Sequence, residues 1–304
     1  MLTRGRPTCS IPFGIATPNV APPDGLPRGL NRLSGAIPLL ATGMGDVVDG
    51  ILEGKVALVT GAGAGLGRGI AEQLARAGAD IAVAEIDAES GATAARELAA
   101  LGVRAQAYPT DVSQSAQVDA TFAAALADFG RLDTVVNNAG ISRIGPHTQD
   151  VTDEDWLASI AVMQTGVFFG MRAAGRIMIE QGSGGSVINI SSIRGHSPNP
   201  GRMTYCAPKA AVIMMTKIAA GEWAHLGIRV NAIAPGVLRT PMWDADVARG
   251  AIDEPFYLDL VPAKRLGTTE DVGRLAVYLA SDASSYVNGS TITIDGALTS
   301  IPAG

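Results

Sequence analysis

The sequence has few cysteines, few charged residues and no basic run. Only Cys9 and Cys206 stand among its 304 residues. Two cysteines are too few for a disulfide framework, so we expect free thiols in a reducing compartment such as the cytoplasm. Charged residues make up 17% of the chain and the net charge is −6, which argues against a nucleic-acid partner. An uncharged apolar stretch of about 18 residues is also missing, so we expect no membrane partner.

Two common kinds of catalytic site lack their usual patterns. The three histidines, His147, His196 and His225, have no metal-ligand spacing with one another or with the cysteines, so no metal is predicted. Ser192 does not stand in a G-x-S-x-G sequence. An α/β-hydrolase nucleophile is therefore not predicted.

Residues 1–50 differ in composition from the rest. They contain seven prolines and little helical or strand periodicity, which predicts a disordered leader. Prolines interrupt the apolar stretch 11–20, so a secretory signal does not fit. The scattered arginines leave a transit peptide open. A translation start at Met44 is the alternative to a leader.

From residue 51 onward, short apolar runs alternate with helical spacing, and 47% of the whole chain is hydrophobic. Such alternation predicts βαβ units and a parallel sheet. We therefore expect residues 51–304 to form a single doubly wound Rossmann-type α/β domain, with helices on both faces of the sheet. The expected strands are 55–60, 81–86, 103–108, 134–137, 186–191, 228–234 and 291–294. The expected helices are 65–78, 88–101, 113–129, 153–179, 204–224 and 269–280, with a less regular stretch at 238–265.

The first expected strand runs into a glycine-rich turn. Residues 60–67 read T-G-x-x-x-G-x-G, with glycine at positions 61, 65 and 67. Glycines permit the tight backbone angles and the close approach that a pyrophosphate needs. The helix that follows offers free N–H groups and the positive end of its dipole. The turn therefore predicts a dinucleotide site.

An acidic residue closes the second expected strand. Glu85 stands 18 residues beyond Gly67, where a carboxylate can accept hydrogen bonds from the adenosine ribose and would repel a 2′-phosphate. NAD is therefore favoured over NADP. Asp87 is a second candidate for this role, and a solvated strand end is the alternative for Glu85.

A catalytic group is indicated by Tyr205 and Lys209, which stand at i and i+4 and share one helix face. Ser192 precedes Tyr205 by thirteen residues, at the end of an expected strand. Reduction of a carbonyl needs a proton donor, and a nearby ammonium would lower the pKa of a tyrosine from about 10. A core tyrosine beside a surface lysine is the alternative.

Together these segments resemble the short-chain dehydrogenase/reductase family over residues 51–297. Further matches are Asp111-Val112, Asn137-Asn138-Ala139-Gly140, Pro235-Gly236 with Thr240, and Asp295-Gly296. The resemblance implies Tyr205 as acid/base, Lys209 as the residue that lowers its pKa and binds the nicotinamide ribose, and Ser192 as the residue that orients the substrate. It also implies a dimer or tetramer, built through the helices expected at 153–179 and 204–224. The implied cofactor residues are Gly61, Gly65, Leu66, Gly67, Glu85, Asp111, Val112, Asn137, Tyr205, Lys209, Val237 and Thr240.

One position departs from the family pattern. Met163 stands where the family carries an asparagine that helps to hold water in a proton path, and a methionine cannot make the hydrogen bonds of an amide. Two functions therefore stay open. The first is an NAD(H)-dependent oxidoreductase that transfers hydride between the cofactor and a secondary alcohol or ketone. The second is an NAD(H)-binding sensor or partner subunit with weak or no catalysis.

The substrate is expected to lie under the stretch 239–265, because variable loops on a rigid sheet commonly cover such sites. Met242, Trp243, Phe256 and Tyr257 are candidates for an apolar lid there; packing under the loop is the alternative. Arg143, Arg194 and His196 follow elements that end near the site. Either arginine could bind a substrate carboxylate, with a solvated loop charge as the alternative.

Overall fold

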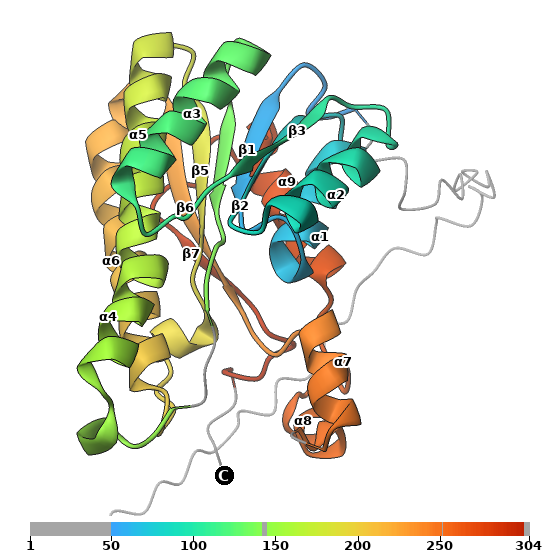
Figure 1. Cartoon of the computed structure of the whole chain (residues 1–304), viewed down its shortest axis with the longest axis vertical. Helices are drawn as coiled ribbons and strands as arrows, with labels where there is room; N and C mark the ends of the chain where they lie inside the picture. Colours follow the sequence, from blue (N-terminus) through green and yellow to red (C-terminus); the bar gives the residue numbers. More distant parts are fainter. Residues whose placement is uncertain (1–49, 142–144, 251, 301–304) are drawn as a thin grey trace, which may run out of the picture. The chain divides into compact units, whose positions relative to one another are not determined.

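A parallel β-sheet lies between two layers of helices (Figure 1). The computed structural model describes residues 50–141, 145–250 and 252–300, which all belong to the compact unit 43–304; the leader predicted for residues 1–50 lies outside them, apart from Gly50. Within the part of the chain that the structure describes, seven strands follow the order β3-β2-β1-β4-β5-β6-β7, every neighbouring pair parallel. The strands are β1 (Val56–Thr60), β2 (Asp80–Glu85), β3 (Ala105–Pro109), β4 (Thr134–Asn137), β5 (Gly185–Ile190), β6 (Ile228–Pro235) and β7 (Thr291–Ile294).

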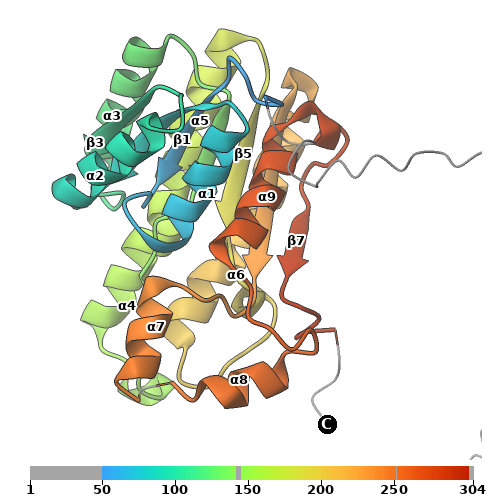
Figure 2. The ribbon, with the colours of Figure 1, turned by 90° about the vertical axis from the view of Figure 1, so that its right-hand side faces the viewer.

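The helices cover both faces of the sheet, as the doubly wound prediction requires. Helices α1, α2 and α9 pack on one face, and α3, α5 and α6 pack on the other (Figures 1 and 2). Each face has its own cluster of buried apolar side chains, which explains why a central strand such as β1, buried over its whole length, reads as a continuous apolar run. The helices are α1 (Gly65–Arg76), α2 (Ala88–Ala99), α3 (Ser115–Phe129), α4 (Asp153–Ile160), α5 (Gly166–Gln181), α6 (Met203–Trp223), α7 (Pro241–Ala248), α8 (Glu254–Leu260) and α9 (Thr269–Ala280).

The strand order reverses beside β1, because the chain first builds β2 and β3 on one side of it and later β4 to β7 on the other. In open parallel sheets, ligands bind beyond the carboxyl ends of the strands at such a switch point. The fold therefore directs the glycine turn after β1, and the chain segments after β4 and β5, toward one place.

The long helix predicted over 153–179 is interrupted. Helix α4 ends at Ile160, a π-helical turn covers Ala161–Thr165, and α5 continues from Gly166. Such turns are frequent at functional sites, and this one contains Met163. By length and composition the run Asp153–Gln181 could cross a membrane, but its inner face packs on the sheet through Val167 and Met171, as in a core helix.

The stretch expected to be less regular contains two helices, α7 and α8. Helix α8 begins at a recognisable cap, since the Asp253 side chain accepts from the N–H of Phe256 and Pro255 follows in the first turn. Figure 2 shows α7 and α8 beyond the end of the sheet where the strand arrowheads point. They therefore lie at the edge where a ligand is expected.

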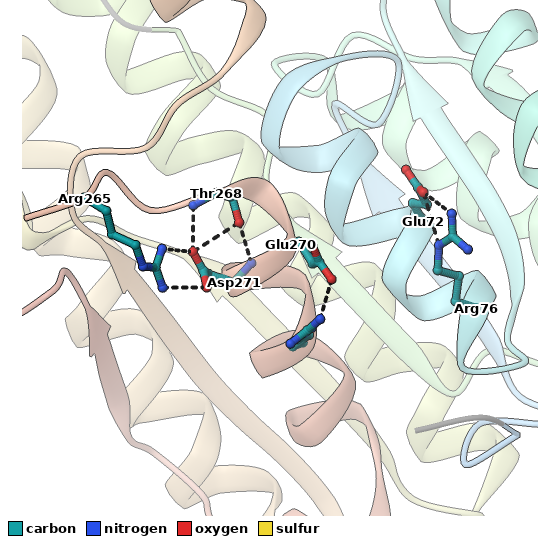
Figure 3. Close-up of polar contacts among 7 residues, drawn as sticks. Glu72, Arg76, Arg265, Thr268, Glu270 and Asp271 are labelled. Carbon is teal, nitrogen blue, oxygen red and sulfur yellow. Dashed lines mark hydrogen bonds and ion pairs between the residues drawn. The ribbon is translucent and has the colours of Figure 1, made fainter. Parts of the chain in front are cut away.

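After this stretch the chain enters helix α9, whose N-terminus is capped by side chains (Figure 3). The Thr268 side chain and Asp271 form a capping box at the start of α9. Arg265 adds two hydrogen bonds to the Asp271 carboxylate, at 2.6 and 3.0 Å. These hydrogen bonds, together with those from Thr268, lower the pKa of Asp271 from 3.8 to about 2, against the opposing effect of burial.

Replacing Asp271 by asparagine should lower the melting temperature by several degrees at pH 7. A carboxyl whose pKa is lower in the folded chain stabilises the fold above its unfolded pKa, and the contribution disappears as the pH falls through the folded value. The difference between the two proteins should therefore shrink between about pH 4 and about pH 2. Glu270→Gln is the control, because its bond to Arg274 is an exposed i,i+4 pair. An equal loss in both variants, measured by thermal denaturation, would contradict the role given to Asp271.

Candidate active site

A cavity of about 620 Å³ opens beyond the carboxyl ends of the central strands. Its walls come from the glycine turn, the ends of β2, β4, β5 and β6, the π-helical turn and the first part of α6. Ser192 and all of the predicted cofactor residues except Asn137 and Val237 line it. Those lining residues are Gly61, Gly65, Leu66, Gly67, Glu85, Asp111, Val112, Tyr205, Lys209 and Thr240.

The glycine turn has the geometry that an anion site needs. Gly61 and Gly65 have φ angles of +65° and +56°, a region that glycine adopts most easily. A Cβ on Gly67 would lie 2.1 Å from the carbonyl oxygen of Gly61, so only glycine permits this approach. Helix α1 has no side-chain cap and no acidic residue in its first turn. Its free N–H groups and positive dipole end therefore fit the pyrophosphate of a dinucleotide.

Asn138 holds this turn in place and was missing from the predicted site residues. Its side chain donates to the carbonyl oxygens of Thr60 and Gly61 at 2.9 and 3.2 Å. Its own N–H and that of Ala139 donate to the Thr60 hydroxyl. Asn138 also lines the cavity. The Asn-Asn-Ala-Gly segment was the signal that could have identified it, but the prediction took only the first asparagine.

Glu85 lies at the cavity wall, against the glycine turn. Its carboxylate accepts from the backbone N–H groups of Gly63 and Ile86, both at 2.9 Å. A Cβ on Gly63 would come within 2.9 Å of that carboxylate, so the glycine lets the two segments meet. Asp87 has a different task, because its side chain caps α2 through the N–H of Ser90. The structure thus separates the two acidic candidates.

Tyr205 and Lys209 stand on α6 and face the same cavity as Ser192. The Lys209 ammonium lies 5.9 Å from the centre of the Tyr205 ring and donates to the carbonyl oxygen of Ile190 at 2.7 Å. Lys209 is 4% exposed. Ser192 follows β5 and its hydroxyl accepts from the N–H of Arg194 at 3.1 Å. The predicted catalytic group is therefore assembled in one place.

The acidity of Tyr205 differs from the sequence-based expectation. Burial raises the pKa of the phenol, which outweighs the hydrogen bond with Ser192 and the charges of Arg202 and Arg194 that lower it. Burial also lowers the pKa of Lys209, to about 8. The pKa of Tyr205 is thus raised in this structure, whereas the sequence led us to expect a lowered one, because desolvation of the phenol is the larger effect.

Met163 lies inside this arrangement. It is 1% exposed, lines the cavity and stands in the middle of the π-helical turn. Its side chain approaches Gly140 at the end of the Asn-Asn-Ala-Gly segment, since a Cβ there would lie 3.7 Å from it. The departure from the family pattern thus places a thioether on the wall of the site.

Asn137 and Val237 do not line the cavity. The Asn137 side chain is 2% exposed and donates to Asn189 on the neighbouring strand, at 2.8 Å. The backbone of Val237 pairs with Gly267, from which its carbonyl oxygen accepts at 3.0 Å. Both residues make hydrogen bonds within the protein and contribute to the framework around the cavity.

The expected lid residues lie on α7 and α8. Trp243 packs edge-on against Tyr257, with ring centroids 5.1 Å apart, and Tyr257 does the same with Phe256 at 5.5 Å. The indole N–H of Trp243 donates to Glu254, which also pairs with Arg239. The aromatic contacts thus join the two helices. The Met242 side chain and Arg143 lie outside the part that the structure describes, and the Arg194 guanidinium donates to the carbonyl oxygen of Pro198.

A metal centre is not indicated. Among residues 50–141, 145–250 and 252–300, no group of three or more His, Cys, Asp or Glu side chains could hold a metal ion. Asp111, the remaining acid at the cavity, accepts from the N–H and the hydroxyl of Ser113 with one oxygen. Among the described residues that line the cavity, the charged side chains are those of Glu85, Asp111 and Lys209.

Three comparisons place the chain among known proteins. The family model described as Enoyl-(Acyl carrier protein) reductase matches residues 61–299. A 2,5-dichloro-2,5-cyclohexadiene-1,4-diol dehydrogenase of Sphingobium indicum is 38% identical over 250 residues, which cover 82% of this chain and 99% of the relative. The structure of a short-chain type dehydrogenase/reductase from Mycobacterium marinum is 37% identical with a TM-score of 0.77, covering 84% of this chain and 98% of the other. A gluconate 5-dehydrogenase from Burkholderia cenocepacia, in complex with NADP and tartrate, is 38% identical with a TM-score of 0.78, covering 84% and 99%.

Proposed function

The chain belongs to the short-chain dehydrogenase/reductase family, and on that premise we propose that it is an oxidoreductase that transfers hydride between NAD(H) and a secondary alcohol or ketone. The observation that carries the proposal is the single cavity shared by the glycine turn, Ser192, Tyr205 and Lys209. A dinucleotide site and a proton donor are the two parts that such a reaction needs. Residues 51–304 are proposed to form the catalytic domain.

Tyr205 is proposed to hold and move the proton. In the direction of ketone reduction, the nicotinamide supplies the hydride and the phenol gives its proton to the oxygen of the substrate. The Ser192 hydroxyl donates a hydrogen bond to the same oxygen and so orients the substrate. The raised pKa keeps the phenol protonated at neutral pH, which suits a donor. Lys209 is proposed to bind the nicotinamide ribose with its ammonium, which is held beside the tyrosine ring.

Glu85 is proposed to select NAD over NADP. It stands at the cavity wall at the end of β2, where the adenosine ribose of a dinucleotide on this turn would lie. Among the described residues that line the cavity, Lys209 is the one cation, and it lies at the catalytic end. A 2′-phosphate would therefore meet a carboxylate without a compensating charge. Val112 and Asp111 are proposed to flank the adenine, and Thr240 the nicotinamide end, as the family resemblance implies.

The substrate is proposed to carry more than one hydroxyl group. The two relatives named above are called a diol dehydrogenase and a gluconate 5-dehydrogenase, and both names denote substrates with several hydroxyl groups. The aromatic group of Trp243, Phe256 and Tyr257 is proposed to act as the lid over the substrate. Such a lid excludes water while leaving the polar groups of the substrate to Ser192 and Tyr205.

The proposal is tested by following NADH and NADPH absorbance with diols, sugar alcohols, aldonates and the corresponding ketones. Turnover with NADH, and much less with NADPH, is the expected result. Turnover mainly with NADPH would contradict the role of Glu85. Tight NADH binding without turnover on any compound would favour the sensor or partner-subunit alternative, and Met163→Asn would then be the variant to compare.

A homo-oligomer is proposed, formed through α5 and α6, which lie side by side on one face of the sheet (Figure 1). Phe168, Met214 and Ile218 are between 47% and 56% exposed on these helices. On α6, Met214 and Ile218 point outward, whereas Met215 packs on the core. A cytoplasmic location is proposed, because two cysteines in 304 residues fit a reducing compartment.

Replacing Met214 by aspartate should convert the oligomer to monomer, because a charge buried at an apolar contact is costly. The measurement is the molar mass by light scattering on a sizing column. Ile51→Asp changes another exposed apolar side chain, 46% exposed against 56% for Met214, outside these helices and should leave the mass unaltered. A monomeric wild-type chain, or a Met214→Asp chain that keeps its mass, would contradict the assignment of this face.

A further inference from the structure

Three consecutive residues around the end of β5 each make a hydrogen bond with α6. The Asn189 side chain donates to the Thr216 hydroxyl at 2.9 Å. The carbonyl oxygen of Ile190 accepts from the Lys209 ammonium at 2.7 Å. The Ser191 hydroxyl donates to the carbonyl oxygen of Lys209 at 2.8 Å. The next residue along the chain is Ser192. These bonds therefore hold α6 against the end of β5, from which the segment with the proposed catalytic serine continues.

The hydrogen bond between Asn189 and Thr216 belongs to a buried series of hydrogen bonds. The groups at both ends of the series fix which partner donates and which accepts. The Asn137 side chain donates to the side-chain amide oxygen of Asn189 at 2.8 Å, and the Thr216 hydroxyl donates to the backbone carbonyl oxygen of Val212 at 2.8 Å. Asn189 and Thr216 are both 0% exposed. Water therefore cannot replace a missing partner, and a buried donor without a partner is costly.

Thr216 lies on the same face of α6 as the proposed catalytic residues. It follows Lys209 by seven residues and Tyr205 by eleven, which are close to two and three full helical turns at about 3.6 residues each. Thr216 is therefore about 16 Å behind Tyr205 along the helix axis, at about 1.5 Å per residue. Lys209 joins the N-terminal part of α6 to β5, and Thr216 joins the C-terminal part of α6 to β5.

We propose that Asn189 and Thr216 are positioning residues, whose hydrogen bond fixes the distance between Ser192 on the β5 segment and Tyr205 on α6. Loss of the hydrogen bond between Asn189 and Thr216 leaves α6 free to tilt or slide about Lys209. Such a movement shifts the Tyr205 phenol relative to the Ser192 hydroxyl. The inference rests on the proposed function, because it assigns the bond a role in the reaction of Ser192 and Tyr205. Neither residue touches the cavity, so both act through the elements that carry them.

Thr216→Val and Thr216→Ser form the matched pair of variants. Valine keeps the shape of the side chain and removes the acceptor, whereas serine keeps the hydroxyl. We expect Thr216→Val to lower kcat about 10-fold, since misplacement by about 1 Å can cost far more, and Thr216→Ser to stay within about twofold. The dissociation constant for NADH should remain within about twofold in both, because the glycine turn follows β1 and Glu85 ends β2, away from α6.

The readouts separate positioning from loss of stability. Ser284→Ala removes another buried hydroxyl, bonded to Leu279, Ser281 and Arg229 away from the cavity, and should lower the melting temperature without lowering kcat. In Thr216→Val the isotope effect on kcat with NADH deuterated at the transferred position should rise above that of the wild type. A misplaced phenol makes the chemical step slower relative to product release.

A second measurement does not require a substrate. The Tyr205 resonance in protein labelled with ¹³C at tyrosine Cζ, assigned by its absence in Tyr205→Phe, reports the titration of the phenol. Burial raises the pKa of Tyr205, so a displaced α6 that admits water should lower the midpoint in Thr216→Val and leave it unaltered in Thr216→Ser.

Equal kcat values and equal titration midpoints in the two Thr216 variants would overturn the inference. A wild-type chain that reduces none of the tested ketones would instead count against the proposed function. In that case the titration of Tyr205 still decides whether Asn189 and Thr216 set its surroundings.

Discussion

Replacing Tyr205 by phenylalanine should lower kcat by about 10³-fold, the range in which positioned acids and bases contribute. The variant keeps the ring over which the Lys209 ammonium lies at 5.9 Å and removes only the hydroxyl. The dissociation constant for NADH should therefore change by about twofold or less, because a single weak contact is lost. Stopped-flow absorbance and NADH fluorescence titration measure the two quantities on the same preparations.

Tyr108→Phe is the control for this experiment. Tyr108 is a buried tyrosine whose hydroxyl donates to Asp128 at 2.8 Å, outside the cavity. Its removal should reduce stability and leave kcat unaltered. If Tyr205→Phe retained the wild-type kcat, Tyr205 could not be the proton donor, whatever the chain does with NADH.

The pH dependence follows from the same two residues. Ketone reduction needs the protonated phenol, and burial extends the range over which Tyr205 stays protonated. Lys209 is charged below its pKa of about 8 and neutral above it. The rate of reduction in the wild type should therefore fall as the pH rises through about 8, because the ammonium that holds the ribose is lost before the phenol ionises.

Replacing Glu85 by glutamine should reduce the preference for NADH over NADPH by about 30-fold to 700-fold. Two unit charges about 4 Å apart near a protein surface repel by about 4 kcal/mol at most, and each 1.4 kcal/mol corresponds to about a tenfold ratio. Glutamine removes the charge and keeps one of the two carboxylate oxygens, which can accept from the N–H of Gly63 or from that of Ile86. The ratio of the two kcat/KM values is the measurement.

Asp87→Asn controls for a general loss of negative charge. Asp87 caps α2 and does not line the cavity, and asparagine is an equally good cap. Its cofactor preference should equal that of the wild type. A Glu85→Gln enzyme that still discriminates as the wild type does would show that another group excludes the 2′-phosphate.

The sequence predicted the sheet and most helices because their patterns are local. Strands β4 and β7 and helix α9 have the predicted bounds, since both strands are rich in β-branched residues and α9 begins at a capping box. The interruption of the long helix at Ala161–Thr165 could not be predicted, because a π-helical turn has no side-chain pattern of its own. Helices α7 and α8 are short, and their apolar residues show little periodicity.

The parts of the site that depend on sequence motifs could be predicted. The buried contacts and the pKa values that depend on the packing of several elements could not. The glycine turn and the Ser192, Tyr205 and Lys209 group come together in one cavity as expected. The Asn137 side chain is bound within the sheet by Asn189, 52 positions away. No local sequence pattern indicates such a contact. The raised pKa of Tyr205 likewise depends on desolvation by residues from several elements.

The most direct test of the account follows the hydrogen itself. A ketone that the wild-type chain turns over is reduced with NADH carrying deuterium at the transferred position of the nicotinamide, and the product is analysed by mass spectrometry. The account predicts a secondary alcohol that is heavier by one deuterium at carbon, formed by the wild type and almost absent with Tyr205→Phe. An alcohol without deuterium, or equal yields from the two proteins, would contradict it.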